Sequence, residues 1–428
     1  MAFSAYAQTN MPSQTITVRY QFNFIHCLYN FLETISGEFG TSETLRDYFE
    51  KSDFNTPHYQ QLIQDFNELD SHTAYYYEYR GYPQSRNMVR SIHEFLIAMS
   101  ASSQNLDDFS YRTVGLLTFS EHKKLMHILR EFEPVYQKLI WEKYAPLLQI
   151  YTEKMQQLAG KVKLPELFTQ VTHFYGAEWS IEIPFIVSFY PIPGRTGHST
   201  ATPNINVETV GAMVENTDSH DLAQNFGVIF HEMCHILFDA ESAVQQNQLE
   251  SYFLKHSSPY TLYTYQLLNE SLATALGNGL AYEKATGQLD AKSWYNDIYI
   301  DTFAKAIHPF VVDYIQQKKQ IDSDFVVTLI QTFEKTFPNA LYAYDNLMRN
   351  VVLLVQSENS KEDRWIRSTL RKFFRVASLK SFSFNDLANT EMNNYYQSEQ
   401  STRMVIITQK QMPLLKNLIE EYPPLKPY

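Results

Sequence analysis

The segment His231-Glu232-Met233-Cys234-His235 has the residue types and the spacing of a zinc hydrolase site. On a helix, two histidines four residues apart lie on the same face, so their neutral imidazoles can bind one zinc ion. Glu232 lies beside them, where its carboxylate can take a proton from a water on the metal and return it to a leaving amine. The pattern therefore predicts one Zn²⁺ per chain, with His231 and His235 as ligands and Glu232 as general base.

The surroundings of this segment are apolar. Residues 228–230 and 236–238 are all hydrophobic, and Glu232 is the only charged residue between positions 228 and 237. Burying a carboxylate in such a helix is costly unless a cation compensates its charge. The alternative is that both histidines are ordinary core or surface residues and Glu232 is a solvated charge. Cys234 is turned about 100° from His235 on the helix, so it is expected to pack in the core.

A hydrolytic zinc site needs a third protein ligand, and two downstream carboxylates compete for this role. Glu270 lies in the helical segment 259–281 among apolar neighbours, a setting that a bound metal would explain. Glu241 follows His235 by six residues, and on a continuing helix it is turned about 240° away. A bend that brought it back would favour glycine at position 238, which is Phe238. We therefore expect Glu270 to be the third ligand.

The elements expected around the site mix strands with helices. Residues 179–190 and 205–210 are rich in β-formers, and residues 222–239 have the helical pattern that carries the histidines. Helical patterns follow at 259–281, 302–318, 324–336 and 341–356, and a β-prone segment at 403–408. Upstream helices are expected at 85–101, 120–133 and 147–159, with breaks or first turns at Pro134 and Pro146.

These patterns predict an α+β, mainly helical protein with two regions. Residues 8–165 form an N-terminal helical region, and residues 166–428 contain the site. In the second region, strands and the zinc helix occupy 179–240, the third-ligand helix 259–281, and C-terminal helices and a strand 302–428.

Composition narrows the class of protein. The chain has 428 residues, of which 44% are hydrophobic and 15% aromatic, so it has ample material for a packed core and is not disordered. Its net charge of −12 opposes binding to nucleic acid. No apolar run approaches the roughly 20 residues of a membrane span. With only Cys27 and Cys234, no disulfide framework is expected.

The N-terminus resembles the end of a secretory leader. Ala5-Tyr6-Ala7 has the small-x-small pattern that precedes a signal-peptide cleavage site, although the basic and long apolar parts of a leader are missing. The alternative is an ordinary frayed terminus. We expect residues 1–7 to be a signal-peptide remnant and the protein to be exported, either to a periplasm or outside the cell.

The site residues resemble those of the gluzincin zinc metallopeptidases, in which a His-Glu-x-x-His helix and a downstream glutamate on a second helix share one zinc. Val228, the uncharged residues at 233, 234 and 236, and Leu237 match the extended signature, and the Asn269-Glu270 pair is similar to that of thermolysin-like members. Thr274 stands where thermolysin-like enzymes have an aspartate. The resemblance covers residues 179–285 and implies a zincin-like catalytic unit with a small β-sheet beside the zinc helix.

Several further roles are implied by this resemblance. A strand upstream of the zinc helix, within 182–189 or 205–210, would pair with an extended substrate. Asp239 and Thr274 are candidates for holding the imidazoles in the right tautomer. The donor for the oxyanion of the tetrahedral intermediate is sought among Tyr342, Tyr344 and His308.

Together these features predict a zinc-dependent metallopeptidase that hydrolyses a peptide or protein substrate. Two alternatives remain open at this point: a non-catalytic protein in which zinc staples two helices, and a zinc hydrolase that acts on another amide. The absence of cysteine from the ligand face and the presence of Glu232 favour a catalytic site over a structural one.

Overall fold

The computed structural model describes residues 15–342, except 38–42, 72–73, 78–87, 195–199 and 217, and, beyond these, 350–355, 378–383, 402–406 and a few shorter stretches. The leader-like residues 1–7 lie outside the described residues, so export stays a prediction. The chain divides into two compact units, Met1–Thr336 and Phe337–Tyr428. The boundary expected near residue 165 does not coincide with a division between units, because the sheet of the first unit joins strands from both sides of it.

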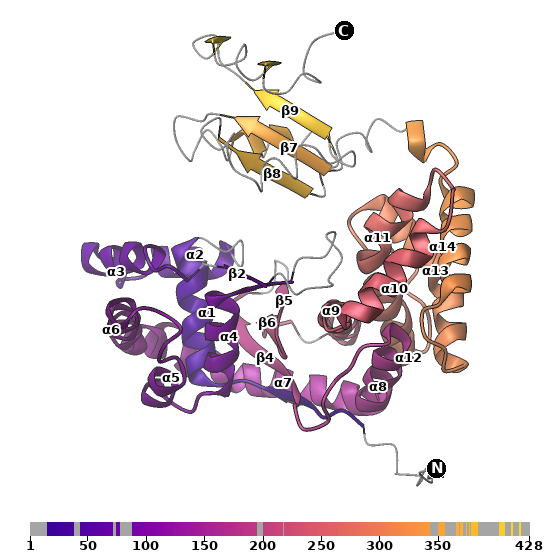
Figure 1. Cartoon of the computed structure of the whole chain (residues 1–428). Helices are drawn as coiled ribbons and strands as arrows, with labels where there is room; N and C mark the ends of the chain where they lie inside the picture. Colours follow the sequence, from indigo (N-terminus) through magenta and orange to yellow (C-terminus); the bar gives the residue numbers. More distant parts are fainter. Residues whose placement is uncertain are drawn as a thin grey trace, which may run out of the picture. The chain divides into compact units, whose positions relative to one another are not determined.

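The first unit contains a four-stranded sheet in the order β1-β4-β6-β5 (Figure 1). Its strands are β1 (Val18–Gln21), β4 (Phe185–Ile192), β5 (Thr200–Asn204) and β6 (Val207–Met213). β1, β4 and β6 are parallel, and β5 runs antiparallel to β6. β4 and β6 are buried along their whole length, as expected of parallel strands covered on both faces. β4 begins just after Pro184, which has no N–H to donate to a ladder.

Helices form most of the N-terminal half of this unit (Figure 1). They are α1 (Phe24–Ser36), α2 (Glu43–Glu50), α3 (Pro57–Asn67), α4 (Ile92–Ser102), α5 (Leu106–Arg112), α6 (Phe119–Tyr136), α7 (Glu142–Val162) and α8 (Leu164–Tyr175). An antiparallel pair, β2 (Ala74–Tyr77) and β3 (Met88–Ser91), lies between α3 and α4 in the chain. The helical character predicted for this region is thus observed.

The breaks predicted at Pro134 and Pro146 are wrong. Pro134 lies inside α6 and Pro146 inside α7, and a π-helical segment, η1 (Gln137–Trp141), joins the two helices. A π turn widens the helix and changes which carbonyls are paired, so a proline without an N–H can be accommodated in a helix that continues.

The helices that follow the sheet carry the predicted site. They are α9 (Ser219–Asp239), α10 (Ala243–Leu254), α11 (Thr261–Thr274), the π-helical η2 (Ala275–Ala281), α12 (Tyr282–Thr286), α13 (Ile298–Gln316) and α14 (Ser323–Thr336). α9 packs against β5 and β6 on one side and against α11 and η2 on the other (Figure 1). It is therefore the helix that joins the sheet to the later helices.

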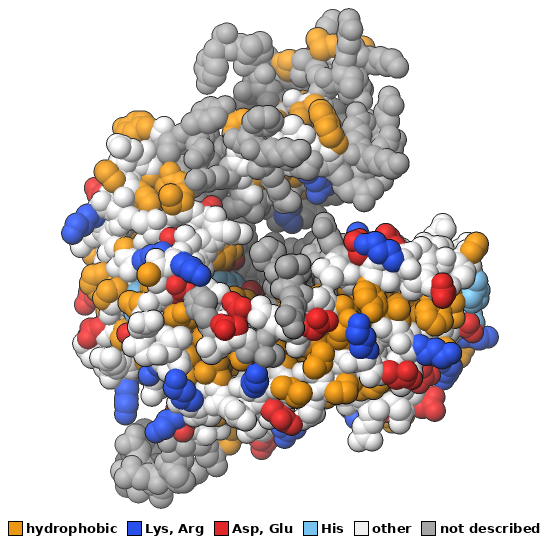
Figure 2. All heavy atoms as spheres, turned by 180° about the vertical axis from the view of Figure 1, so that it is seen from behind, with side chains coloured by type: hydrophobic (Ala, Val, Ile, Leu, Met, Phe, Trp, Pro, Cys, Tyr) orange, Lys and Arg blue, Asp and Glu red, His pale blue; other side chains and the backbone are white. Residues whose placement is uncertain are grey.

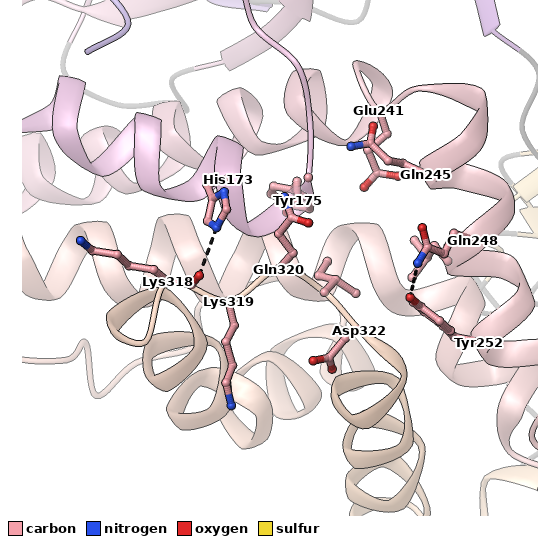
Figure 3. A pocket seen from close by; sticks show the side chains of 13 residues that line it. His173, Tyr175, Glu241, Gln245, Gln248, Tyr252, Lys318, Lys319, Gln320 and Asp322 are labelled. Carbon is pink, nitrogen blue, oxygen red and sulfur yellow. Dashed lines mark hydrogen bonds between the residues drawn. The ribbon is translucent and has the colours of Figure 1, made fainter. Parts of the chain in front are cut away.

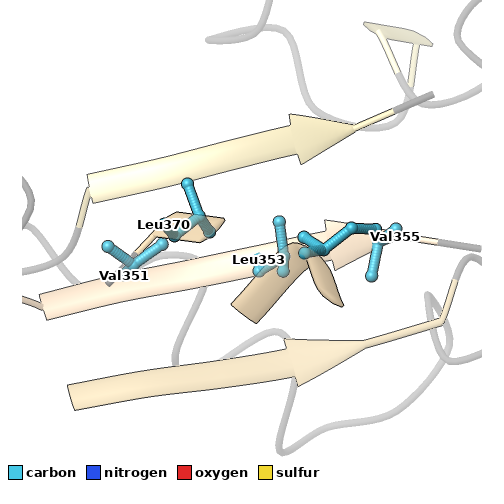
Figure 4. Packing of buried hydrophobic residues seen from close by; sticks show 5 residues of the cluster. Val351, Leu353, Val355 and Leu370 are labelled. Atoms are coloured by element: carbon cyan, nitrogen blue, oxygen red, sulfur yellow. The ribbon is translucent and has the colours of Figure 1, made fainter. Parts of the chain in front are cut away.

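The second unit contains a parallel three-stranded sheet in the order β8-β7-β9. Its strands are β7 (Asn350–Val355), β8 (Ser378–Phe382) and β9 (Thr402–Ile406). Val351, Leu353 and Val355 on β7 pack with Ile366 and Leu370 in its core (Figure 4). The helix predicted at 341–356 is wrong, because its apolar run is a central strand buried on both faces, whereas the strand predicted at 403–408 corresponds to β9.

The mainly helical α+β class is confirmed by these elements. No helix in the described part of the chain is long and apolar enough to cross a bilayer. On the face seen in Figure 2, acidic and basic side chains are interspersed, and the described residues form no continuous basic stripe there.

Candidate metal centre

The position of α9 is fixed by close contact between its backbone and that of η2. A Cβ built on Gly277 would lie 2.5 Å from the backbone nitrogen of His231 and closer still to the carbonyl oxygen of Gly227. Only glycine leaves room for two helices at this separation. Because η2 continues α11, the same contact brings Glu270, one turn before the end of α11, to the histidine-bearing face of α9.

The three predicted ligands meet at one point. The Nε2 atoms of His231 and His235 are 3.0 Å apart. Glu270 places Oε2 3.5 Å from Nε2 of His231 and Oε1 3.7 Å from Nε2 of His235. His231 is almost completely buried, whereas 38% of the Glu270 side chain is exposed, so the cluster opens on the side of Glu270.

Two polar groups on α11 contact the outer nitrogens of these imidazoles. Asn269 Oδ1 lies 3.0 Å from Nδ1 of His235, and Thr274 Oγ1 lies 3.5 Å from Nδ1 of His231. An amide oxygen can only accept, so His235 carries its proton on Nδ1 and directs the Nε2 lone pair into the cluster. Thr274 has the position expected of it. Asp239, the other residue expected to hold an imidazole, is exposed at the end of α9. Asn269 makes a contact of this kind with His235.

Glu232 belongs to the same cluster. Each of His231, Glu232 and His235 offers a ligand atom within 4.8 Å of the other two. Burial raises the pKa of Glu232 to about 7, with the Glu270 carboxylate adding to the rise and His235 opposing it. Burial also raises the pKa of Glu270, but its interactions with His231 and His235 outweigh this and lower it. The two carboxylates therefore differ in the ease with which they bind a proton.

Tyr295 is a site residue that the sequence analysis missed. Its ring stacks on that of His231, with 5.8 Å between centroids and 15° between planes, and its hydroxyl interacts with Glu270. Burial and the Glu270 carboxylate raise the pKa of Tyr295, so the phenol keeps its proton and can donate it in a hydrogen bond. It lies in the irregular segment between α12 and α13, where no periodicity marks it.

The rival ligand Glu241 lies in a different place. It follows the end of α9 and is buried, and it lines a cavity of about 440 Å³ with residues from α8, α10 and the turn between α13 and α14 (Figure 3). Gln245 and Gln248 of α10 and His173 of α8 line the same cavity. Because the chain turns away after α9 instead of bending back, the structure separates Glu241 from the two histidines.

Of the three expected oxyanion donors, only His308 lies among the described residues of the first unit. His308 is buried on α13, where its ring packs edge-on against Trp294 at 5.4 Å between centroids and lies beside Gly279. Tyr342 belongs to the second unit, and Tyr344 lies outside the described residues. Cys234 is completely buried, as expected of a core residue.

The two segments expected to pair with substrate belong to inner strands of the sheet. Residues 182–189 overlap β4, which lies between β1 and β6, and residues 205–210 overlap β6, which lies between β4 and β5. Neither is an edge strand, so this prediction is wrong. β5 lies at the edge of the sheet as described and packs against α9. Its polar sequence, Thr-Ala-Thr-Pro-Asn, gave no strand signal.

The chain matches no protein-family model, no curated protein and no solved structure. A function for this protein therefore has to be inferred from the geometry of the site.

Proposed function

We propose that this protein is a zinc-dependent metallopeptidase with a gluzincin-like, zincin-type catalytic unit. The observation that carries the proposal is the spacing of the His231, His235 and Glu270 ligand atoms, which lie 3.0, 3.5 and 3.7 Å apart. Ligands at about 2.0–2.1 Å from a tetrahedral zinc lie about 3.3 Å from one another. The distances between the ligand atoms of this cluster are close to that value, and this agreement supports a zinc site.

The donor set also fits a catalytic zinc. Two imidazole nitrogens and one carboxylate oxygen leave a fourth position for water or substrate, whereas structural sites are filled by four protein ligands, commonly with cysteine. The exposed side of Glu270 gives that position access from solvent. One zinc per chain follows because the described residues contain one group of metal-ligating side chains, His231, Glu232 and His235, and Glu270 adjoins its two histidines.

Each residue of the site has a distinct task in peptide hydrolysis. Zinc bound here would supply Lewis-acid polarisation of the scissile carbonyl and lower the pKa of a water ligand toward about 7. Glu232 takes a proton from the attacking water and delivers it to the amine nitrogen as the carbon–nitrogen bond breaks. Asn269 and Thr274 hold the imidazoles. The Tyr295 hydroxyl is the donor best situated to stabilise the developing oxyanion.

Metal analysis combined with hydrolysis tests this proposal. Plasma mass spectrometry on protein purified without chelator or affinity metal should find one zinc per chain, which Glu270→Ala should lose. Glu232→Gln should keep the zinc and reduce hydrolysis of a peptide library by about 10²–10⁴-fold. Glu241→Gln, a buried acid in the other cavity, is the matched control and should change neither result.

The alternatives are distinguished by the same measurements. If both the wild-type protein and Glu232→Gln retain zinc and neither cleaves any peptide, the zinc is structural and links α9 to α11. Hydrolysis of another amide but of no peptide would indicate a zinc amidase. If the parent protein holds no zinc and acquires none on addition, the site does not bind the metal and the proposal is wrong.

A further inference from the structure

A second cavity, of about 340 Å³, lies alongside α9. Its walls come from the end of β6, the N-terminal half of α9, η2, the start of α12 and the residues Asp290, Ser293 and Trp294. Ligand-binding cavities in proteins measure about 300–1,000 Å³, so this one has room for a single side chain.

The cavity lies along the same face of α9 as the candidate metal centre. Asp221, Asn225 and Val228 line it, and Glu232 and His235 follow at spacings of four and three residues, which keeps all five on one stripe of α9. The far wall has the same continuity, because Trp294 lines the cavity and the next residue, Tyr295, stacks on His231. A chain bound at the metal centre would therefore pass this cavity within a few residues.

The charges that face the cavity are of one sign. Asp221 and Asp290 line it, and no lysine or arginine is among its lining residues. Asn216 donates to Asp221 over 2.7 Å, and Gln224 donates to Asp290 over 3.1 Å, so amide groups orient both carboxylates. The ammonium of Lys305 on α13 lies 5.6 Å from the centroid of the Trp294 ring and is bound 3.0 Å from Asp301.

The remaining wall is apolar. Met213 and Val228 line it, together with the indole of Trp294, whose ring nitrogen donates to the carbonyl oxygen of Asp290. Long basic side chains pack their methylene stems on such surfaces and place the charged head among carboxylates. The cavity thus combines an apolar wall with an anionic end, which matches lysine or arginine better than an acidic or a purely aliphatic side chain.

We propose that this cavity is the specificity subsite of the enzyme and that it binds the lysine or arginine side chain of a peptide substrate near the scissile bond. Asp221 and Asp290 bind the charged head, and Met213 and Val228 contact the stem. The inference rests on the proposed peptidase function, because the cavity is a subsite only if the adjoining cluster cleaves peptides.

Cleavage of internally quenched peptides tests this subsite. At one position, the wild-type protein should prefer lysine or arginine over glutamine or methionine by at least about tenfold in kcat/KM. The double variant Asp221→Asn, Asp290→Asn keeps the shape of both side chains and should lose this preference, while its zinc content and its kcat/KM for the glutamine peptide stay within about threefold of wild type. Asp313→Asn, an acid on the exposed face of α13, is the control and should change nothing.

Binding of benzamidine, a small cationic probe, gives a second readout that needs no hydrolysis. Titration of the zinc-free protein should give a dissociation constant that rises at least about tenfold in the double variant. Peptides cleaved without preference for basic residues, or a preference unchanged in the double variant, would overturn the subsite but leave the peptidase. Benzamidine binding without cleavage of any peptide would overturn the peptidase, and with it the substrate subsite.

Discussion

Two buried helices of the first unit, α1 and α9, both carry histidine in apolar surroundings, but the histidine nitrogens have different partners in the two helices. In α1, His26 is completely buried with Nδ1 3.0 Å from Ser100 Oγ, and Glu33 on the same helix faces His93, with 2.6 Å between Oε1 and Nε2. In α9, the Nε2 atoms of His231 and His235 face each other 3.0 Å apart. Buried histidine alone does not indicate a metal site; convergence of several nitrogen and oxygen lone pairs does.

The largest expected difference between the helices is in metal binding. His235→Gln removes one ligand and should weaken zinc binding by more than about 100-fold, since loss of an outer partner alone costs 10–100-fold. His26→Gln should leave zinc affinity unchanged, because α1 holds its histidine with protein groups. Competition with a chromophoric chelator measures both affinities. Equal losses of zinc affinity in the two variants would contradict the conclusion that α9, and not α1, carries the metal ligands.

How far the sequence predicts this site depends on whether the information is local. The spacing of four residues between His231 and His235 fixes their common face by helix geometry alone, and the apolar neighbours of Glu270 marked a carboxylate in need of a partner. Tyr295 could not be found in this way, because it reaches the cluster from an irregular segment whose path depends on the packing of α12 and α13.

The fold shows the same limit. Helices with clear periodicity, such as α9 and α13, were predicted from the sequence to within a few residues. β7 was mistaken for a helix, because a run of buried apolar residues has the same appearance in either state. β5 was missed because its residues are polar and its pairing with β6 is a tertiary contact. The division at Thr336 likewise depends on contacts between distant segments.

The second expected effect concerns the helix contact that distinguishes α9. Gly277→Ala adds a methyl group against the backbone of Gly227 and His231, where no side chain can move aside, so it should cost about 3 kcal/mol of unfolding free energy and weaken zinc binding. Gly160→Ala is the matched control, because nothing lies within 4 Å of its added Cβ inside α7. It should stabilise the protein by about 0.5–1 kcal/mol. Urea denaturation measures both, and a well-tolerated Gly277→Ala would contradict this account of how α9 is positioned.

The smallest expected effect is the pH dependence that α1 contributes. Burial lowers the pKa of His26 to about 3, so between about pH 6.5 and 3 the unfolded chain binds a proton that the folded chain does not. Stability should therefore fall as the pH decreases through this window, by at most about 1.4 kcal/mol per pH unit from this group. His26→Gln removes the contribution of this proton to the unfolding free energy. Urea unfolding of the zinc-free proteins at pH 7.5, 5.5 and 4.5 should therefore show that the variant loses less stability on acidification than wild type.

Glu208 on β6 provides a control of opposite sign. Its side chain is fully buried, neither carboxylate oxygen has a hydrogen-bond partner among the described residues, and burial raises its pKa well above the ordinary value. The folded chain then holds a proton that the unfolded chain releases above about pH 4.5, so this group lowers stability as the pH rises. Glu208→Gln should raise stability at pH 7.5 more than at pH 4.5, because the wild-type carboxylate must take up a proton on folding at pH 7.5, and this cost is small at pH 4.5. If His26→Gln and Glu208→Gln shifted the pH profile in the same direction, the burial assigned to one of the two side chains would be incorrect.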